Sequence, residues 1–290
     1  MKFVHYIKIK VLVCMSALMT MILFNGCNYF AKPLELSSEH FLFVATTQTS
    51  SIAEMQEGID LAEEFYSTLA NIIPREYELD SVIVVQLNGK YRGPGTYAYM
   101  DNQGTIQLWR YPEELGGYWS LFAHELVHAI AFDTSVKVGV YEWQSFGFYN
   151  EAWAEYLSLL IDPEKTGFPF YGFQENVVVG HWIMHGGITL AKLRTSHEEL
   201  NLSCPHQSYT MRASWFRFVD ETYGRNATLE IMYGGKEMTP VVVEKILGES
   251  LIIVDNKWQK WVLKHYASHP GADAQAASYR ASISYYQPCQ

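Results

Sequence analysis

Two histidines and a glutamate stand at a spacing that can bind and use a metal ion. They lie in the run His124-Glu125-Leu126-Val127-His128, in which the histidines are four residues apart. On a helix, side chains at this spacing share one face, so both imidazoles can reach a single Zn²⁺. Glu125 follows the first histidine, where it can accept a proton from a water molecule on the metal. Two exposed or capping histidines on an ordinary helix are the alternative explanation.

The surrounding segment favours metal binding. The predicted helix from Trp119 to Phe132 is apolar on nearly all sides, which is typical of a buried helix. Burying two histidines and a glutamate without partners would cost several kcal/mol. A metal ion is a natural common partner for all three side chains, so we expect this helix to carry a metal site.

A catalytic zinc site needs a third protein ligand, and a second apolar helix offers one. This predicted helix runs from Asn150 to Ile161 and contains two acids one turn apart, Glu151 and Glu155. We assign Glu151 as the third ligand. Glu155 lies on the same face and can accept the free ring N–H of a ligand histidine. A solvated surface acid is the alternative for Glu155.

These two segments resemble the gluzincin branch of zinc metallopeptidases, the thermolysin-like superfamily. The resemblance rests on His-Glu-x-x-His, followed by Asn-Glu-x-x-x-acid in which the Asn stands 22 residues after the second His. It implies a zincin-like fold in which zinc is bound by His124, His128 and Glu151. It also implies that Glu125 is the general base and that Glu155 supports a ligand, although thermolysin has the shorter Asp there. The order of predicted elements resembles compact bacterial members over roughly residues 38–266.

The resemblance also suggests how a transition state is stabilised. Tyr209 begins a predicted helix, Ser208 to Tyr223, at a point where related enzymes place a Tyr or His. We therefore expect Tyr209 to donate a hydrogen bond to the developing oxyanion, with His206 as second choice. A packed aromatic side chain is the alternative. The predicted strand 96–100 offers either an edge for an extended peptide substrate or a covered structural edge.

A second histidine pair does not predict a second metal site. His181 and His185 are also four residues apart, but no glutamate follows the first of them. We expect these side chains to line a pocket or to bond to backbone carbonyls.

The periodicity along the chain predicts an α+β fold: a small N-terminal mixed sheet with an edge hairpin, then a mostly helical C-terminal part. Turns are predicted at Asn88-Gly89 and at Gly93-Pro94-Gly95. Strands are predicted at 41–45, 81–87, 96–100 and 105–109, and further helices at 52–73, 177–185, 240–247 and 256–265.

The first 26 residues are typical of a lipoprotein signal peptide. Three lysines precede the apolar run from Val11 to Phe24, which is shorter than the roughly 20 residues of a membrane-spanning helix. The following Gly26-Cys27 resembles a bacterial lipobox, although Phe24 stands where Leu is usual. This implies acylation of Cys27 and a lipid anchor in the bacterial cell envelope. An uncleaved N-terminal anchor is the alternative. Residues 27–38 then form a tether and 39–290 a single domain.

The two remaining cysteines, Cys204 and Cys289, form an even pair in an exported chain. An oxidising compartment favours a disulfide between them, with two unpaired thiols as the alternative. The spacing of the cysteines alone does not decide between the two.

Composition limits the classes of partner. The chain has 290 residues, of which 49% are hydrophobic, which excludes disorder over most of its length. Its net charge of −10 argues against nucleic acid, and no pattern indicates an oligomeric state. We expect a membrane-tethered zinc peptidase that acts on peptide or protein substrates. The alternatives are a non-catalytic binding lipoprotein and a zinc amidase that acts on cell-wall material.

Overall fold

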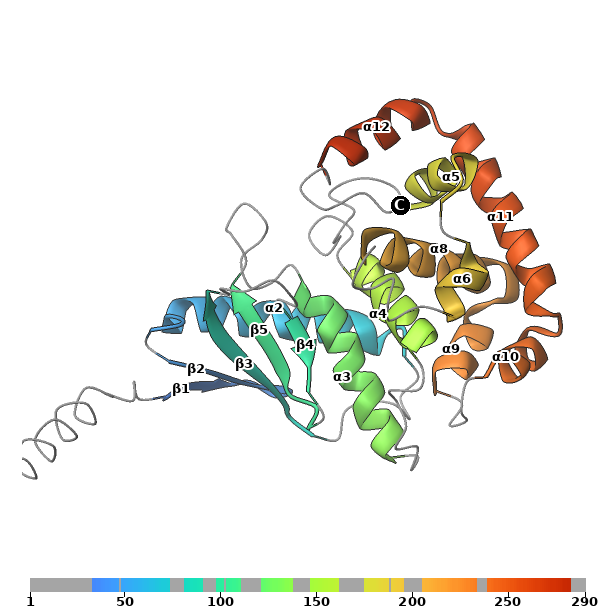
Figure 1. The fold of residues 1–290 in the computed structure, drawn as a ribbon. Coiled ribbons are helices and arrows are strands. Elements are labelled where there is room, and N and C mark those ends of the chain that lie inside the picture. Colours follow the sequence, from blue (N-terminus) through green and yellow to red (C-terminus); the bar gives the residue numbers. More distant parts are fainter. Residues whose placement is uncertain are drawn as a thin grey trace, which may run out of the picture.

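The computed structural model describes residues 33–282, apart from 47, 74–80, 91–97, 102, 111–120, 138–146, 162–174, 188, 196–204 and 234–238. A small sheet and two helices form one half, and the other half is helical (Figure 1). The α+β prediction is therefore confirmed. The strands are β1 (Pro33–Ser37), β2 (Phe41–Thr46), β3 (Ile83–Lys90), β4 (Ala98–Met100) and β5 (Ile106–Arg110). The helices are α2 (Ile52–Ala70), α3 (Phe122–Lys137), α4 (Gly147–Ile161), α5 (Glu175–Met184), α6 (Leu190–Thr195), α8 (Pro205–Tyr223), α9 (Arg225–Tyr233), α10 (Pro240–Leu247), α11 (Leu251–Ser268) and α12 (Ala272–Ser282).

The sheet is mixed, and its strand order is β1-β2-β3-β5-β4. The central strand β3 runs parallel to β2 and β5, whereas β1 and β4 are antiparallel to their neighbours. The predicted hairpin is confirmed, because β4 pairs with β5 and lies at one edge of the sheet. Strand β4 ends at Met100, next to Glu125 of α3.

Helices α2 and α3 cover the same face of the sheet. The rings of Phe41 and Phe43 on β2 both lie 6.2 Å from the ring of Phe122 on α3. Phe41 also lies 6.3 Å from Tyr66 on α2. This shared core fixes α3 against the sheet, and Phe122 stands just before the first histidine of the motif.

Two local predictions need correction. Residues 33–37, assigned to the tether, form strand β1, in which Leu34 and Leu36 pack against the core. The predicted turn at Asn88-Gly89 lies inside β3, where the pairing with β5 shifts register. Asn and Gly favour turns, but the pairing with β5 outweighs that preference and leaves only an irregularity in the register between Asn88 and Lys90. Residues 93–95 lie outside the described part.

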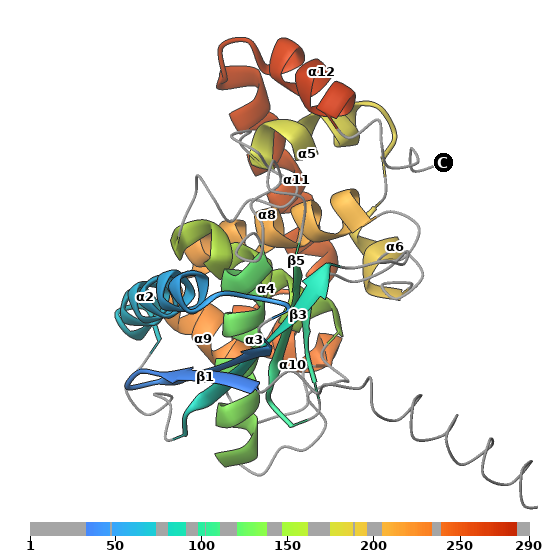
Figure 2. The ribbon, with the colours of Figure 1, turned by 90° about the vertical axis from the view of Figure 1, so that its left-hand side faces the viewer.

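The helical half is built around α4 and α8. Trp153 of α4 packs with its ring 5.6 Å from that of Phe216 on α8, and both side chains are fully buried. Figures 1 and 2 show α5, α11 and α12 beyond α8, on the side away from the sheet. Helices α6, α9 and α12 were not predicted from the sequence, and the first two are short. Within the described residues, no helix is both long and apolar enough to cross a membrane.

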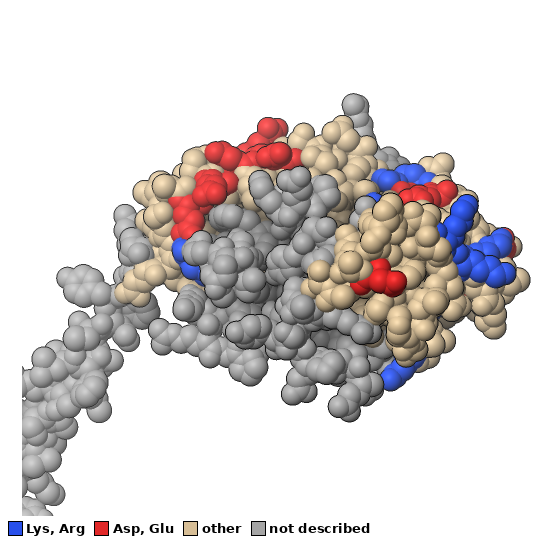
Figure 3. All heavy atoms as spheres, turned by 90° about the horizontal axis from the view of Figure 1, so that it is seen from above, with Lys and Arg blue, Asp and Glu red and all other residues tan. Residues whose placement is uncertain are grey.

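Charges on the surface are segregated. Exposed acids, among them Glu57 and Asp60, lie along α2. Exposed lysines, among them Lys260 and Lys264, lie along α11. In Figure 3 the acidic row and the main cationic groups lie at opposite ends of the visible face. On this face the acids lie on the half that carries the sheet.

Candidate metal centre

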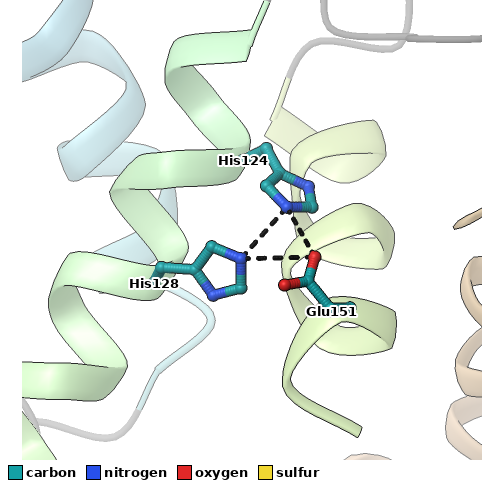
Figure 4. A group of neighbouring side chains, drawn as sticks. All are labelled: His124, His128 and Glu151. Carbon is teal, nitrogen blue, oxygen red and sulfur yellow. Dashed lines mark hydrogen bonds and ion pairs between the residues drawn. The ribbon is translucent and has the colours of Figure 1, made fainter. Parts of the chain in front are cut away.

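Three side chains from two helices meet with their ligand atoms facing one another (Figure 4). His124 and His128 extend from α3, and their Nε2 atoms are 3.0 Å apart. Oε2 of Glu151, on α4, lies 3.2 Å from His124 Nε2 and 3.6 Å from His128 Nε2. The four-residue spacing on α3 and the packing of α3 against α4 thus bring the three predicted ligands together.

The triangle formed by these atoms has the size that zinc requires. Tetrahedral bonds of about 2.0–2.1 Å hold neighbouring ligand atoms roughly 3.3 Å apart. The observed separations of 3.0, 3.2 and 3.6 Å bracket that value, and a point about 1.9 Å from all three atoms lies at the centre of the triangle. The donor set of two imidazoles and one carboxylate also suits zinc, so the residues fit this ion.

Glu155 orients the first histidine. Its Oε2 lies 3.0 Å from Nδ1 of His124, and the residue is only 4% exposed. The solvated alternative for Glu155 is therefore wrong. A neutral imidazole that donates Nδ1–H to this carboxylate has its lone pair on Nε2, directed toward Glu151. Lone pairs of His124 and Glu151 then face each other, an arrangement that a cation between them stabilises.

The electrostatics of the cluster favour a positive charge at its centre. Burial alone would lower the pKa of His124, but Glu151 and Glu155 outweigh it and hold that pKa well above its usual value. Burial would likewise raise the pKa of Glu151, yet the two histidines hold it well below the ordinary range. The cluster thus binds a proton strongly. A divalent cation at the same place would be stabilised by the same negative charges.

Glu125 lies in the same buried region and contacts the sheet edge. It is 6% exposed, and burial raises its pKa, an effect that the two histidines partly counter. Its carboxylate also accepts a hydrogen bond from the backbone N–H of Met100, the last residue of β4. A carboxylate whose proton affinity is increased by burial is suited to receive a proton near neutral pH.

Tyr209 lies beside the cluster. Its ring centre is 5.7 Å from that of His124, in an edge-to-face arrangement. Burial, together with the charge of Glu151, raises the pKa of Tyr209 well above its ordinary value. The phenol is therefore protonated near neutral pH and can donate its hydrogen. The side chain of His206, the second choice, is outside the described part.

Sequence reasoning missed Arg212. This side chain is fully buried, and its guanidinium carbon lies 5.5 Å from the ring centre of Tyr209. An arginine in a helix usually indicates a solvated face. Its position three residues after Tyr209, on the same face of the predicted helix, is the one signal that the sequence offers.

The structure describes the second histidine pair but not the predicted cysteine sites. His185 Nδ1 lies 2.8 Å from the carbonyl oxygen of His181, which agrees with the expected backbone bond. Among the described residues, the only group of three ligands that could hold a metal ion is that of His124. Cys27, Cys204 and Cys289 lie outside the described residues, as does the predicted signal peptide.

Comparison with known proteins finds no matching protein family, no similar curated protein and no similar solved structure. The resemblance to gluzincins therefore rests on the sequence alone.

Proposed function

We propose that this protein is a membrane-tethered, extracytoplasmic zinc metallopeptidase that hydrolyses peptide bonds. One observation supports this most: the ligand atoms of His124, His128 and Glu151 converge at zinc-binding separations while Glu125 is buried in the same region. A binding protein has no need of a buried general base at this place. The complete set therefore favours catalysis over binding alone.

The proposed roles follow from the chemistry of each side chain. His124, His128 and Glu151 hold the metal ion, which when bound polarises the scissile carbonyl and acidifies a water molecule. Glu125 takes the proton of the attacking water and passes it to the leaving amine. Tyr209, kept protonated by its raised pKa, donates a hydrogen bond to the oxyanion.

Substrate binding along β4 fits the position of the base. β4 is an edge strand, and its last residue, Met100, donates a backbone hydrogen bond to Glu125. A peptide that adds to this edge in extended form would lie beside the general base. The edge would supply main-chain hydrogen bonds, so affinity would depend little on particular substrate side chains.

Export and anchoring are proposed from the sequence of the first 27 residues. The cationic start, the apolar run and Gly26-Cys27 support cleavage before Cys27 and its acylation, which would place the enzyme at the bacterial cell envelope. Metabolic labelling with a fatty acid tests this. Label on the wild-type chain and its loss in Cys27→Ser are the expected results.

Cleavage of a peptide library tests the proposed activity. The full chain is incubated with the library, with and without a chelator, and the products are identified by mass spectrometry. We expect one zinc per chain, cleavage without chelator, and recovery when zinc is restored. Zinc without cleavage would instead indicate a binding lipoprotein. Release of fragments from purified peptidoglycan, with no peptide cleavage, would indicate a cell-wall amidase.

A further inference from the structure

Helix α2 carries a stripe of acids on its solvent-facing side. Glu57, Asp60 and Glu64 are all exposed, and their steps of three and four place them on one face of the helix, away from its buried residues. The helix contains no lysine or arginine. Within the described part of the chain, none of these three carboxylates forms an ion pair, and the one side chain bonded to them is Gln56, whose Nε2 donates to Asp60 at 2.9 Å. This acidic stripe therefore has no cation of its own chain beside it.

Helix α11 carries a matching stripe of cations. Lys257, Lys260 and Lys264 repeat the same steps of three and four, and all three are exposed. The one acid of this helix, Asp255, forms its ion pair with α6 instead. Lys257 pairs with Glu249, whereas Lys260 and Lys264 form no ion pair among the residues that the structure describes. This basic stripe thus keeps at least two cations available to an acidic surface.

Both stripes begin at an exposed apolar end. On α2, Ile52 is 63% exposed, and on α11 Ile252 and Ile253 are 75% and 48% exposed. Single exposed apolar side chains are ordinary, but these stand in the first turn of the two helices that carry complementary charge. If the two helices lie side by side in parallel, the charges of the two stripes come into register and the isoleucines come to the same end. Apolar contact beside paired charges is the composition of a protein interface.

The two stripes of one chain do not face each other. Figures 1 and 2 show α2 on the half that carries the sheet and α11 on the far side of the helical half. Two copies, in contrast, can bring the acidic stripe of one against the basic stripe of the other. The net charge of −10 makes copies repel one another in general, so only a contact between opposite charges favours association. An anionic lipid surface would also suit α11, but it would leave the acidic stripe without a partner.

We propose that this chain associates head to tail, with the acidic stripe of α2 on one copy docked in parallel against the basic stripe of α11 on the next. The contact joins two different faces, so it is heterologous and continues into a ring or a row of copies. Exposed ion pairs are weak individually and are screened by salt, so the association is reversible and depends on ionic strength. The proposal does not depend on zinc binding or on catalysis.

Two differently tagged copies of the full chain, mixed in non-ionic detergent, test the docking by co-purification. One variant reverses the acidic stripe and a second reverses the basic stripe: Glu57→Lys, Asp60→Lys and Glu64→Lys in the first, Lys257→Glu, Lys260→Glu and Lys264→Glu in the second. We expect wild-type copies to co-purify at about 50 mM salt and recovery to fall about tenfold at about 0.5 M salt, where charges are screened within roughly 4 Å. Each reversed variant should lose pairing with itself, because its two stripes then carry the same sign. The two variants mixed together should pair again.

Glu230→Lys and Lys192→Glu are the matched controls. Both residues are exposed and lie outside the two stripes, so neither change should alter recovery. Wild-type copies that do not co-purify at low salt would overturn the proposal, and so would two reversed variants that fail to restore each other. If copies do not pair and reversal of the basic stripe instead weakens binding to phosphatidylglycerol vesicles but not to phosphatidylcholine vesicles, α11 faces a membrane and the proposal is wrong. None of these results bears on zinc, so the proposed peptidase activity is tested separately.

Discussion

At the scale of single residues, a change at Glu125 can test proton transfer while metal binding is left intact. Its carboxylate is not one of the three converging ligands, yet it lies beside them. Glu125→Gln keeps the size and the hydrogen bond from Met100 but removes the base. We expect kcat to fall by roughly 10²–10⁴-fold while one zinc per chain remains, as measured by peptide cleavage and metal analysis.

Its control is Glu151→Gln, which should lose zinc and activity together. If Glu125→Gln also releases the metal, the residue is a ligand or a structural acid, and its assignment as general base is wrong.

The role of Tyr209 can be tested by removing a single atom, because only its hydroxyl oxygen is assigned a role in the reaction. Tyr209→Phe keeps the ring against His124, so packing and metal content should be unchanged. Loss of one oxyanion donor typically costs about 10²–10³-fold in kcat, with little change in KM. Steady-state kinetics on a cleaved library peptide measure both. Wild-type kcat in Tyr209→Phe would favour the alternative of a packed aromatic side chain.

At the scale of elements, the ligand helix α4 is tied to its neighbours through one acid. Asp220 of α8 accepts hydrogen bonds from Tyr156 of α4 at 2.6 Å and from Arg225 of α9 at 2.6 and 2.7 Å. Burial would raise the pKa of Asp220, but Arg225 and Tyr156 outweigh it and lower that pKa. Because Arg225 is 35% exposed and solvent screens part of its attraction, Asp220→Asn should reduce the free energy of unfolding by roughly 1–2 kcal/mol at neutral pH.

The pH dependence follows from the lowered pKa. A carboxyl whose pKa is depressed in the folded chain stabilises it above the unfolded-state pKa of about 3.9, and this contribution is lost as pH falls through the folded-state pKa. Denaturant unfolding should show a constant difference between wild type and Asp220→Asn from about pH 8 down to about 5, which shrinks only in more acid solution. Glu221→Gln, on the exposed side of the same helix, should show almost no difference. A difference that grows on acidification would contradict the assignment.

The elements also show what sequence can and cannot predict. The histidine spacing and the apolar surroundings of Glu151 are properties of single helices, so the sequence sufficed to select the residues that the structure brings together. Arg212 could not be selected in this way, because its burial depends on how α8 packs against α4. Strand β1 is short and half-exposed, and only its pairing with β2 distinguishes it from a tether.

At the scale of the whole molecule, the candidate metal centre joins the two halves of the fold. Its histidines are on α3, which packs on the sheet, and Glu151 is on α4, which packs on the helical half (Figure 1). A bound cation would therefore stabilise the contact between the halves as well as the site. We expect chelation to lower the unfolding temperature by about 10 °C, the shift that corresponds to about 4 kcal/mol of binding at 1,000 times the dissociation constant.

The size of that shift should increase with pH. In the metal-free chain the raised pKa of His124 stabilises the fold below the unfolded-state pKa of about 6.5, and this contribution is lost as pH rises through the folded-state pKa. Zinc needs the unprotonated ligand, so its stabilisation grows over the same interval. Thermal unfolding with and without chelator should therefore show a gap that is small near pH 5.5 and largest near pH 8.5. In Glu151→Gln the chelator should not change the unfolding temperature at either pH. If the difference in unfolding temperature in the wild type instead narrows as pH rises, protons and zinc do not compete at His124.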